Sequence, residues 1–280
     1  MKITMLGTAA IGYPLTFCNC DNCKEARLHK GKSIRKRASM LVNDDLIIDL
    51  GPDTQTAMMM YDKDMGKIKY LLQTHIHSDH YDAGLLTTRM PYMAMEKHNK
   101  LEIYAHPECL KIMSNMVSQY EKADLISEEG ANKLKIHSNE IRAGEIVSIG
   151  NYKVKAIETL HDVKHGSLLF IITENGKSIF YATDTPALTT KALDELKGYK
   201  LNVVIMDHTF GNADYSFSHL NEKLFIEQIN KMKNLGIIDE STQIYGTHIS
   251  HDGMACHEKI EARAEENGYK IAYDGMEIGI

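Results

Sequence analysis

The feature that most constrains this chain is a cluster of polar side chains directly after an apolar run. The run YLL leads into residues 74–80, whose sequence is THIHSDH. This segment holds three imidazoles and one acidic side chain close together: His75, His77, His80 and Asp79. A strand that ends at a sheet edge cannot bury so many polar groups unless partners satisfy them. Because imidazole suits borderline divalent cations and a carboxylate adds a hard, charged ligand, the segment predicts a metal site.

Three further metal-ligand candidates stand beyond later strands. His161, Asp184 and His248 each come two residues after the end of an expected strand. A rigid sheet holds side chains at its strand ends in fixed positions, which suits metal ligation. Taken alone, each of these residues would fit an ordinary structural role equally well.

The pattern of apolar residues predicts an α/β (α+β) protein. Short segments rich in β-branched and aromatic residues alternate with helical segments, and no repeat or Pro/Gly/Ser-rich linker divides residues 1–280. We therefore expect a single domain in which two sheets pack face to face and helices cover them outside. The expected strands are residues 3–6, 39–42, 46–49, 68–73, 103–105, 152–159, 168–173, 178–182, 203–206, 243–246 and 277–279. The expected helices are residues 107–120, 220–234 and 254–265.

Charge and hydropathy exclude some classes of partner. The formal net charge is −6, and the one concentrated basic run, residues 29–37, fits a solvated surface better than a phosphate-binding patch. A long nucleic acid would require a broader positive surface, so we do not expect one as substrate. No run approaches the roughly 20 apolar residues of a membrane span, and no segment resembles a signal peptide. We expect a cytoplasmic protein with no membrane partner.

The cysteines indicate a second metal site. Cys18, Cys20 and Cys23 fall within six residues, which is too close for an ordinary disulfide framework. Thiolates at this spacing can reach one tetrahedral zinc ion from a tight loop, and such an ion needs a fourth ligand. Cys109 and Cys256 are candidates for it, although both also fit small buried apolar residues.

The HxHxDH pattern, with single His, Asp and His residues after later strands, resembles the metallo-β-lactamase superfamily. That resemblance implies an αββα sandwich with a dinuclear site at one edge of the sheets. It implies two divalent cations, of zinc, manganese or iron, with seven ligands: His75, His77 and His161 on the first, Asp79, His80 and His248 on the second, and Asp184 between them. Asp49 matches the acidic residue that orients a ligand histidine in this family.

Three segments resemble the PhnP-type phosphodiesterases, which are accessory enzymes of the carbon–phosphorus lyase pathway that open cyclic ribose phosphates. They are residues 18–23 (CNCDNC), 247–251 (THISH) and 273–279 (YDGMEIG). The likeness spans nearly the whole chain. It implies a structural zinc whose four ligands are Cys18, Cys20, Cys23 and His251.

The resemblance implies a phosphodiesterase that acts on small, cyclic ribose phosphate-like diesters through a hydroxide held between two cations. Asp184 would fix the spacing of the metals, and Asp79 would help to position the nucleophile. The leaving alkoxide needs a proton. Where the family has a histidine for this step the chain has Phe217, so His219, two places later, is the expected general acid and His208 is the alternative.

Other functions remain open at this point. A tRNA 3′-processing endonuclease of the same superfamily would need a Gly-rich and basic arm, and the sequence has none. A lactonase or thioesterase would use the same ligand set, because metal ligands alone do not distinguish acyl from phosphoryl chemistry. A non-catalytic metal-binding module is the alternative of another class. Dimers are common among similar folds, so a second copy of the chain is a candidate partner by analogy alone.

Overall fold

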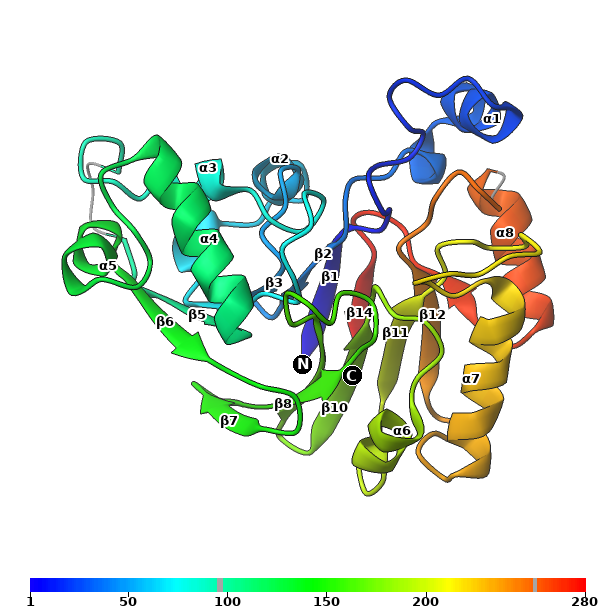
Figure 1. The fold of residues 1–280 in the computed structure, drawn as a ribbon. Coiled ribbons are helices and arrows are strands. Elements are labelled where there is room, and N and C mark those ends of the chain that lie inside the picture. Colours follow the sequence, from blue (N-terminus) through cyan, green and yellow to red (C-terminus); the bar gives the residue numbers. More distant parts are fainter. Residues whose placement is uncertain (95–97, 254–255) are drawn as a thin grey trace.

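Two seven-stranded sheets pack face to face in the computed structural model of the chain, which describes residues 1–94, 98–253 and 256–280 (Figure 1). The first sheet has the order β14-β1-β2-β3-β4-β5-β6. Its strands are β1 (Lys2–Gly7), β2 (Ser39–Val42), β3 (Leu46–Ile48), β4 (Tyr70–Leu72), β5 (Leu101–Ala105), β6 (Ile136–Glu140) and β14 (Glu277–Gly279). The second sheet has the order β13-β12-β11-β10-β9-β8-β7. Its strands are β7 (Ile146–Ile149), β8 (Tyr152–Glu158), β9 (Leu168–Glu174), β10 (Lys177–Ala182), β11 (Val203–Asp207), β12 (Gln243–Thr247) and β13 (Lys270–Ile271).

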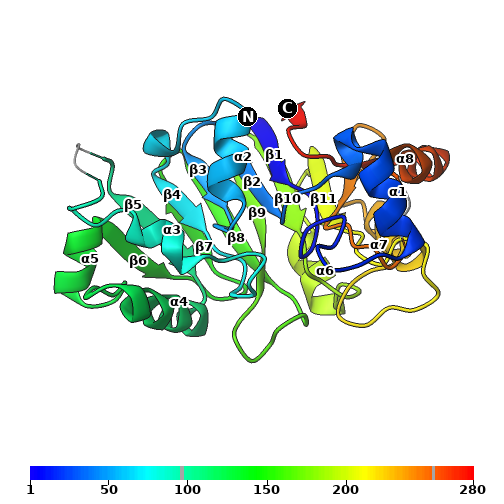
Figure 2. The same ribbon diagram turned by 90° about the horizontal axis from the view of Figure 1, so that it is seen from above.

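Helices cover the outer faces of both sheets (Figures 1 and 2). The first sheet carries α2 (Thr54–Met60), α3 (Ala83–Thr87), α4 (Pro107–Tyr120) and α5 (Glu128–Leu134). The second sheet carries α6 (Thr190–Leu196), α7 (Glu222–Asn234) and α8 (His257–Glu266). The helix α1 (Asp21–His29) lies apart from these layers, beyond the strand ends at the top of Figure 1, and two short 3₁₀ turns span Gly31–Ser33 and Met65–Lys67. The predicted αββα sandwich is therefore confirmed.

Successive side chains of a strand point to opposite faces of the sheet, so the apolar side chains form three layers. One layer lies between the two sheets, and the other two lie between each sheet and its helices. In β10, Ile179 and Tyr181 point into the core between the sheets, whereas Phe180 and Ala182 pack under α6 and α7. The first sheet behaves in the same way, since Ile48 faces the central core and Ile47 faces the helices α2–α5. Because each buried strand is apolar on both faces, the runs of hydrophobic residues in the sequence are nearly continuous.

All eleven expected strands are present, and the strands that the sequence pattern missed are β6, β7 and β13. Each of these three lies at an edge of its sheet. Most residues of β6 and β7 are exposed or half-buried, so these strands lack the apolar pattern on which the prediction depends. The helix α4 has the predicted bounds. The helix expected over residues 254–265 is α8, and residues 254–255 lie outside the described residues.

The basic run of residues 29–37 is less solvated than its sequence suggests. Arg35 is buried, and its guanidinium donates to Thr8 Oγ1 and to the carbonyl oxygen of Ala272, and contacts His257 Nδ1. The expectation of a solvated face is wrong for this residue. Its guanidinium contacts link Thr8 in the N-terminal segment to His257 and Ala272 near the C-terminus. Across the described ranges, no helix combines the length and the apolar character that a membrane crossing requires.

Parallel pairing brings several strand ends to one edge of the sandwich. β3, β4 and β5 are parallel to one another, as are β10, β11 and β12. β8 and β10 are both antiparallel to β9, so they also run in one direction. The segments that follow these strands therefore emerge side by side, and this edge carries the candidate site.

Candidate metal centres

The structure brings all seven predicted dinuclear ligands together at this edge. His75, His77, Asp79 and His80 come from the turn after β4, and His161, Asp184 and His248 follow β8, β10 and β12 respectively. We call these seven residues the His/Asp cluster. They fall into the two groups that the resemblance implied, because the ligand atoms of His75, His77 and His161 lie within 4.8 Å of one another, as do those of Asp79, His80, Asp184 and His248.

Asp184 lies between the two groups. Its Oδ1 is 3.9 Å from His75 Nε2 and 3.5 Å from His161 Nε2. Its Oδ2 is 3.0 Å from His80 Nε2 and 3.2 Å from His248 Nε2. Each carboxylate oxygen thus faces one group, which is the arrangement of a carboxylate that bridges two cations.

The donor set fits a pair of divalent cations. Nε2 of His75 is buried without a hydrogen-bond partner, and such an atom costs about 1–3 kcal/mol unless something binds it. His80 Nε2 and His248 Nε2 face each other at 3.3 Å, as do His161 Nε2 and His77 Nδ1 at 3.2 Å. Converging imidazole nitrogens around one carboxylate match the ligand preference of zinc, manganese or iron.

Polar groups behind the cluster fix the orientation of its imidazoles. His80 Nδ1 lies 2.7 Å from Asp49 Oδ2, and because a carboxylate accepts, Nδ1 carries the proton and Nε2 faces the centre. Asp49 therefore lies where the resemblance placed it. Thr74 Oγ1 is 2.9 Å from His75 Nδ1, and Thr209 Oγ1 is 2.7 Å from His248 Nδ1. Such partners fix both ring orientation and tautomer in metal sites.

The electrostatics of the cluster also favour bound cations. Burial raises the pKa of Asp184, but the imidazoles of His248, His80 and His75 outweigh it and hold that pKa well below its ordinary value. Burial, reinforced by His80, lowers the pKa of His75 well below its ordinary value. Asp184 is thus ionised and His75 neutral, which are the protonation states that ligate metals. Burial lowers the pKa of His80, but Asp184, Asp49 and Asp79 outweigh it and hold that pKa well above its ordinary value.

Backbone strain is concentrated at the same place. Asp49, Asp184 and His248 have φ values of 62°, 55° and 63°, in the left-handed region that side-chain-bearing residues rarely adopt. Each such residue costs on the order of 1–3 kcal/mol. All three end or follow a strand of the sandwich, so the surrounding sheets hold the strained conformations in place.

The structure separates the two candidates for the general acid. His219 lies beside the cluster, with its ring stacked on His248 at 5.2 Å and tilted against His161 at 4.6 Å. His208 is buried on the other side of its strand, where Nε2 lies 2.9 Å from Tyr269 Oη and the ring contacts Phe225. Burial lowers the pKa of His208 to about 4.

Asp207 and Asp162 are two acidic residues that the sequence reasoning missed. Asp207, at the end of β11, is fully buried, and its Oδ2 lies 2.7 Å from His219 Nδ1. Burial lowers the pKa of His219, but Asp207 outweighs it and raises that pKa to about 9. Asp162 Oδ2 lies 3.5 Å from His77 Nε2. A signal for Asp207 was available, because a carboxylate ends an otherwise apolar strand just as Asp49 does.

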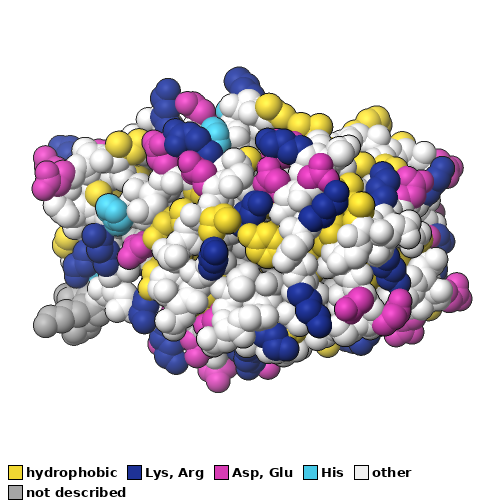
Figure 3. Space-filling view, turned by 90° about the horizontal axis from the view of Figure 1, so that it is seen from below, with side chains coloured by type: hydrophobic (Ala, Val, Ile, Leu, Met, Phe, Trp, Pro, Cys, Tyr) yellow, Lys and Arg dark blue, Asp and Glu magenta, His cyan; other side chains and the backbone are white. Residues whose placement is uncertain are grey.

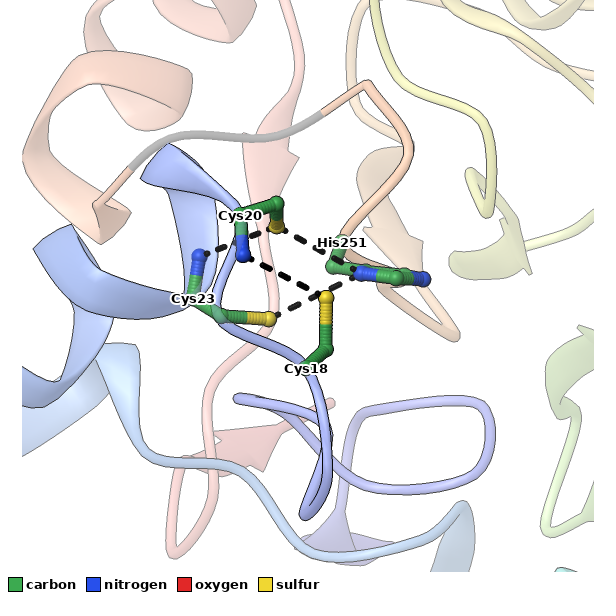
Figure 4. Close-up of side chains that lie close together, drawn as sticks. All are labelled: Cys18, Cys20, Cys23 and His251. Atoms are coloured by element: carbon green, nitrogen blue, oxygen red, sulfur yellow. Dashed lines mark hydrogen bonds between the residues drawn. The ribbon is translucent and has the colours of Figure 1, made fainter.

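The three clustered cysteines meet His251 in a separate group (Figure 4). Cys20 Sγ and Cys23 Sγ each lie 3.6 Å from His251 Nδ1, and the backbone N–H of Cys20 donates to Cys18 Sγ at 3.5 Å. We call these four residues the Cys/His cluster. The N–H of Cys23 donates to Cys20 Sγ and lowers the pKa of that thiol to about 6, so one sulfur is readily ionised.

The alternatives for the fourth ligand of the Cys/His cluster lie elsewhere. Cys109 is buried in α4 under the first sheet, where burial raises its pKa well above the ordinary value. Cys256 is buried at the start of α8 and groups with Glu25 and His29. Neither belongs to the group formed by the other three cysteines, so the geometry favours His251.

One pocket connects both clusters. A cavity of about 340 Å³ is lined by Asp79, Asp184 and His219, and also by His251 and Asp252. Among the described residues of its lining there is no lysine or arginine. A second cavity, of about 280 Å³, lies between the first sheet and α2–α3, and its mainly apolar lining includes no residue of either cluster.

Comparison with known proteins places this site in a family. A family model described as "Beta-lactamase superfamily domain" matches residues 45–249. A curated Ribonuclease Z from Methanosarcina acetivorans is 28% identical over 146 residues, which are 50% of this chain and 44% of that protein. The chain thus spans less than half the length of this relative.

Solved structures share the fold over the whole chain. The crystal structure of a diphosphatase from the PhnP family has a TM-score of 0.73 at 19% identity, covering 99% of this chain and 96% of that one. Zn²⁺-bound PqqB from Methylobacterium extorquens has a TM-score of 0.70 at 18% identity and covers 100% of both chains. The short form of human tRNase Z has a TM-score of 0.66 at 18% identity, covering 100% and 99%.

The family match extends from just before β3 to the residue after His248, so it includes Asp49 and the whole His/Asp cluster. Family and cluster together support a metal-dependent hydrolase. The chain belongs to the β-lactamase superfamily domain family and has the metallo-β-lactamase fold.

Proposed function

We propose that this protein is a metal-dependent phosphodiesterase that acts on small diesters. The observation that carries the proposal is the bridging position of Asp184 between two ligand groups at the base of a pocket. His75, His77 and His161 would hold one cation, and Asp79, His80 and His248 the other. When bound, such a pair supplies Lewis acidity and an activated water for attack on phosphorus.

The residues around the pocket supply the remaining parts of the mechanism. Asp184 fixes the spacing of the two ligand groups, and Asp79 lines the pocket where it can orient the attacking water. His219 also lines the pocket, and its Nδ1 is committed to Asp207, so its Nε2 is the proton donor to the leaving alkoxide. The carboxylate of Asp207 raises the pKa of His219 and so favours the protonated form of this ring.

The pocket favours a small substrate. The pocket lining described by the structure lacks lysine and arginine, whereas a tRNA would need many phosphate contacts. The face of the molecule opposite α1, which lies away from this pocket, carries interspersed basic and acidic side chains (Figure 3). A cyclic ribose phosphate-like diester, whose single charge the cations would neutralise, suits this pocket.

A ribonuclease Z-like nuclease is the second candidate, because the curated relative bears that name. The test is a panel of substrates offered to protein loaded with zinc, manganese or iron. Bis(p-nitrophenyl) phosphate and a cyclic ribose phosphate represent small diesters, and a precursor tRNA, a lactone and a thioester represent the alternatives. We expect turnover of the small diesters alone. Hydrolysis confined to the precursor tRNA, the lactone or the thioester would replace the proposal, and no turnover at all would favour a non-catalytic metal-binding module.

A further inference from the structure

Three aromatic rings gather on the loop between β11 and α7, outside the hydrophobic core. Phe210 and Tyr215 have ring centroids 5.2 Å apart, Phe210 and Phe217 5.9 Å, and Tyr215 and Phe217 5.5 Å. We call these three residues the aromatic triad. Phe217 is 74% exposed and Tyr215 is 42% exposed, although an aromatic side chain gains most when it is buried. A cluster of exposed rings marks a surface that something covers.

The triad continues the wall of the pocket. Phe210 lines the pocket that contains the His/Asp cluster, and its ring lies 5.7 Å from the ring of His219. Tyr215 and Phe217 contact Phe210 and extend the aromatic surface outward from it. Ile11 and Leu15 add aliphatic side chains to the same pocket lining. Beyond the His/Asp cluster, the pocket lining therefore combines these apolar side chains with polar ones such as Ser250 and Asp252.

The loop that carries the triad is held in place. Tyr215 Oη donates to Asp252 Oδ1 at 3.0 Å, and Asn221 Nδ2 donates to the carbonyl oxygens of Ala213 and Tyr215. A Cβ at Gly253 would lie 1.9 Å from Phe210 O, so only glycine permits this close contact between the two loops. Rings that are ordered before a ligand arrives lose little entropy on binding it.

We propose that the aromatic triad is a stacking platform for a planar base, so that the preferred substrate is a diester of a nucleoside. This inference rests on the proposed function, because a phosphodiester seated on the His/Asp cluster would carry its substituent past His219 toward Phe210. The described lining contains no lysine or arginine that would bind a second phosphate, which favours an uncharged ring system there. Stacking of a base on an aromatic side chain contributes about 1–3 kcal/mol, or roughly 5-fold to 150-fold in affinity.

The test compares two diesters that share one leaving group. Adenosine 5′-(p-nitrophenyl phosphate) carries a base, and methyl p-nitrophenyl phosphate does not. We expect the zinc-loaded or manganese-loaded protein to favour the adenosine ester at least tenfold in kcat/KM. Phe217→Ala is expected to lower this ratio at least fivefold, whereas Phe217→Tyr keeps it. The matched control is Tyr120→Ala, since Tyr120 is 67% exposed at the end of α4 and its removal leaves both rates unchanged.

The outcomes distinguish this inference from the function on which it rests. Hydrolysis of both esters with a ratio near one, or a ratio that Phe217→Ala does not change, would overturn the platform and leave the phosphodiesterase intact. If neither ester is hydrolysed, the proposed function fails, and the platform is then tested by calorimetry. The affinity for adenosine 5′-monophosphate is compared with the affinity for ribose 5-phosphate. Tighter binding of the nucleotide that is lost in Phe217→Ala supports the platform, and equal binding of the two ligands overturns it. A Phe217→Ala variant that only turns a dimer into a monomer would make the triad an interface between copies.

Discussion

The two candidate metal centres differ in what surrounds them. The His/Asp cluster lies at the ends of strands from both sheets, and His75, His80 and Asp184 in it are almost completely buried. The Cys/His cluster takes three ligands from one short segment and the fourth from a loop, and Cys20 in it is exposed. The His/Asp cluster contains residues with strained backbone and is surrounded by buried hydrogen bonds. The Cys/His cluster lies beside a small apolar core of Ala9, Tyr13, Cys23 and Ala26.

This difference predicts different roles for the two metals. The sheets hold the His/Asp cluster in place through packing, so its cations should contribute chemistry more than folding. The segment around the Cys/His cluster has only a small apolar core, so we expect its cation to contribute folding free energy. His248 and His251 lie on one loop, and the side chain of Asn22 donates to the carbonyl oxygen of His251 at 2.8 Å. We therefore expect a change in the second cluster to affect the first.

The largest expected effect comes from Asp184→Asn. The amide keeps the shape but loses the charge that faces both ligand groups. We expect kcat for bis(p-nitrophenyl) phosphate to fall about 10³-fold or more, since transition-state stabilisation by such metal sites amounts to several kcal/mol. The melting temperature should stay within a few degrees of the native value. Asp194→Asn, at an exposed position on α6, is the control. Native rates with full metal content in Asp184→Asn would contradict the assignment.

His219→Gln tests the general acid, and we expect a loss of about 10²–10⁴-fold in kcat. The loss should appear with an alkyl leaving group, whose alkoxide needs a proton, and should be small with p-nitrophenolate, which leaves without one. The measurement is kcat for both diesters with metal content held equal. Equal losses for the two leaving groups would make His219 a positioning residue that acts through His248.

Cys23→Ser sharpens the contrast between the clusters. We expect the loss of one zinc per chain by elemental analysis, a lower melting temperature, and a fall in activity of about tenfold as the loop that carries His248 loosens. Cys109→Ser is the matched control, because that buried thiol lies outside both clusters, and it should keep all its zinc. If Cys23→Ser instead lost the active-site metals and kept its melting temperature, the assigned roles of the two clusters would be reversed.

His208→Gln is expected to change activity least, by less than about twofold, because its ring contacts Phe225 and Tyr269 instead of the pocket. Its effect is on pH dependence. With a folded pKa of about 4, below the ordinary 6.5, buried neutral His208 contributes stability above pH 6.5 that is lost as the pH falls toward 4. Glutamine does not titrate. Between pH 6.5 and 5, the free energy of unfolding of the variant should therefore fall by about 2 kcal/mol less than that of the native protein. Parallel denaturant titrations at the two pH values measure this difference, and equal losses in both proteins would show that His208 is protonated with an ordinary pKa.

Much of the site could be predicted because its residues carry local signals. Two motifs are visible in any reading of the sequence. One is the set of three imidazoles and a carboxylate within residues 75–80, and the other is the set of three cysteines within residues 18–23. His161, Asp184 and His248 were predictable only together with the family resemblance, since a lone polar residue after a strand is common. Their closeness in the structure supports the predicted ligand set, and the metals that they would hold remain a proposal.

The sequence by itself determined the alternation of strands and helices, the buried strands of both sheets and the candidate ligands, because buried strands and dense ligand motifs carry their signal within a few residues. Only the tertiary structure decided what depends on long-range contacts. It placed the edge strands β6, β7 and β13, which lack a fully buried apolar pattern. It set Asp207 and His208 on opposite sides of β11, because successive side chains point to opposite faces. It also brought Phe210, with Tyr215 and Phe217 packed against it, to a pocket whose other residues follow strands as far apart along the chain as β4 and β12.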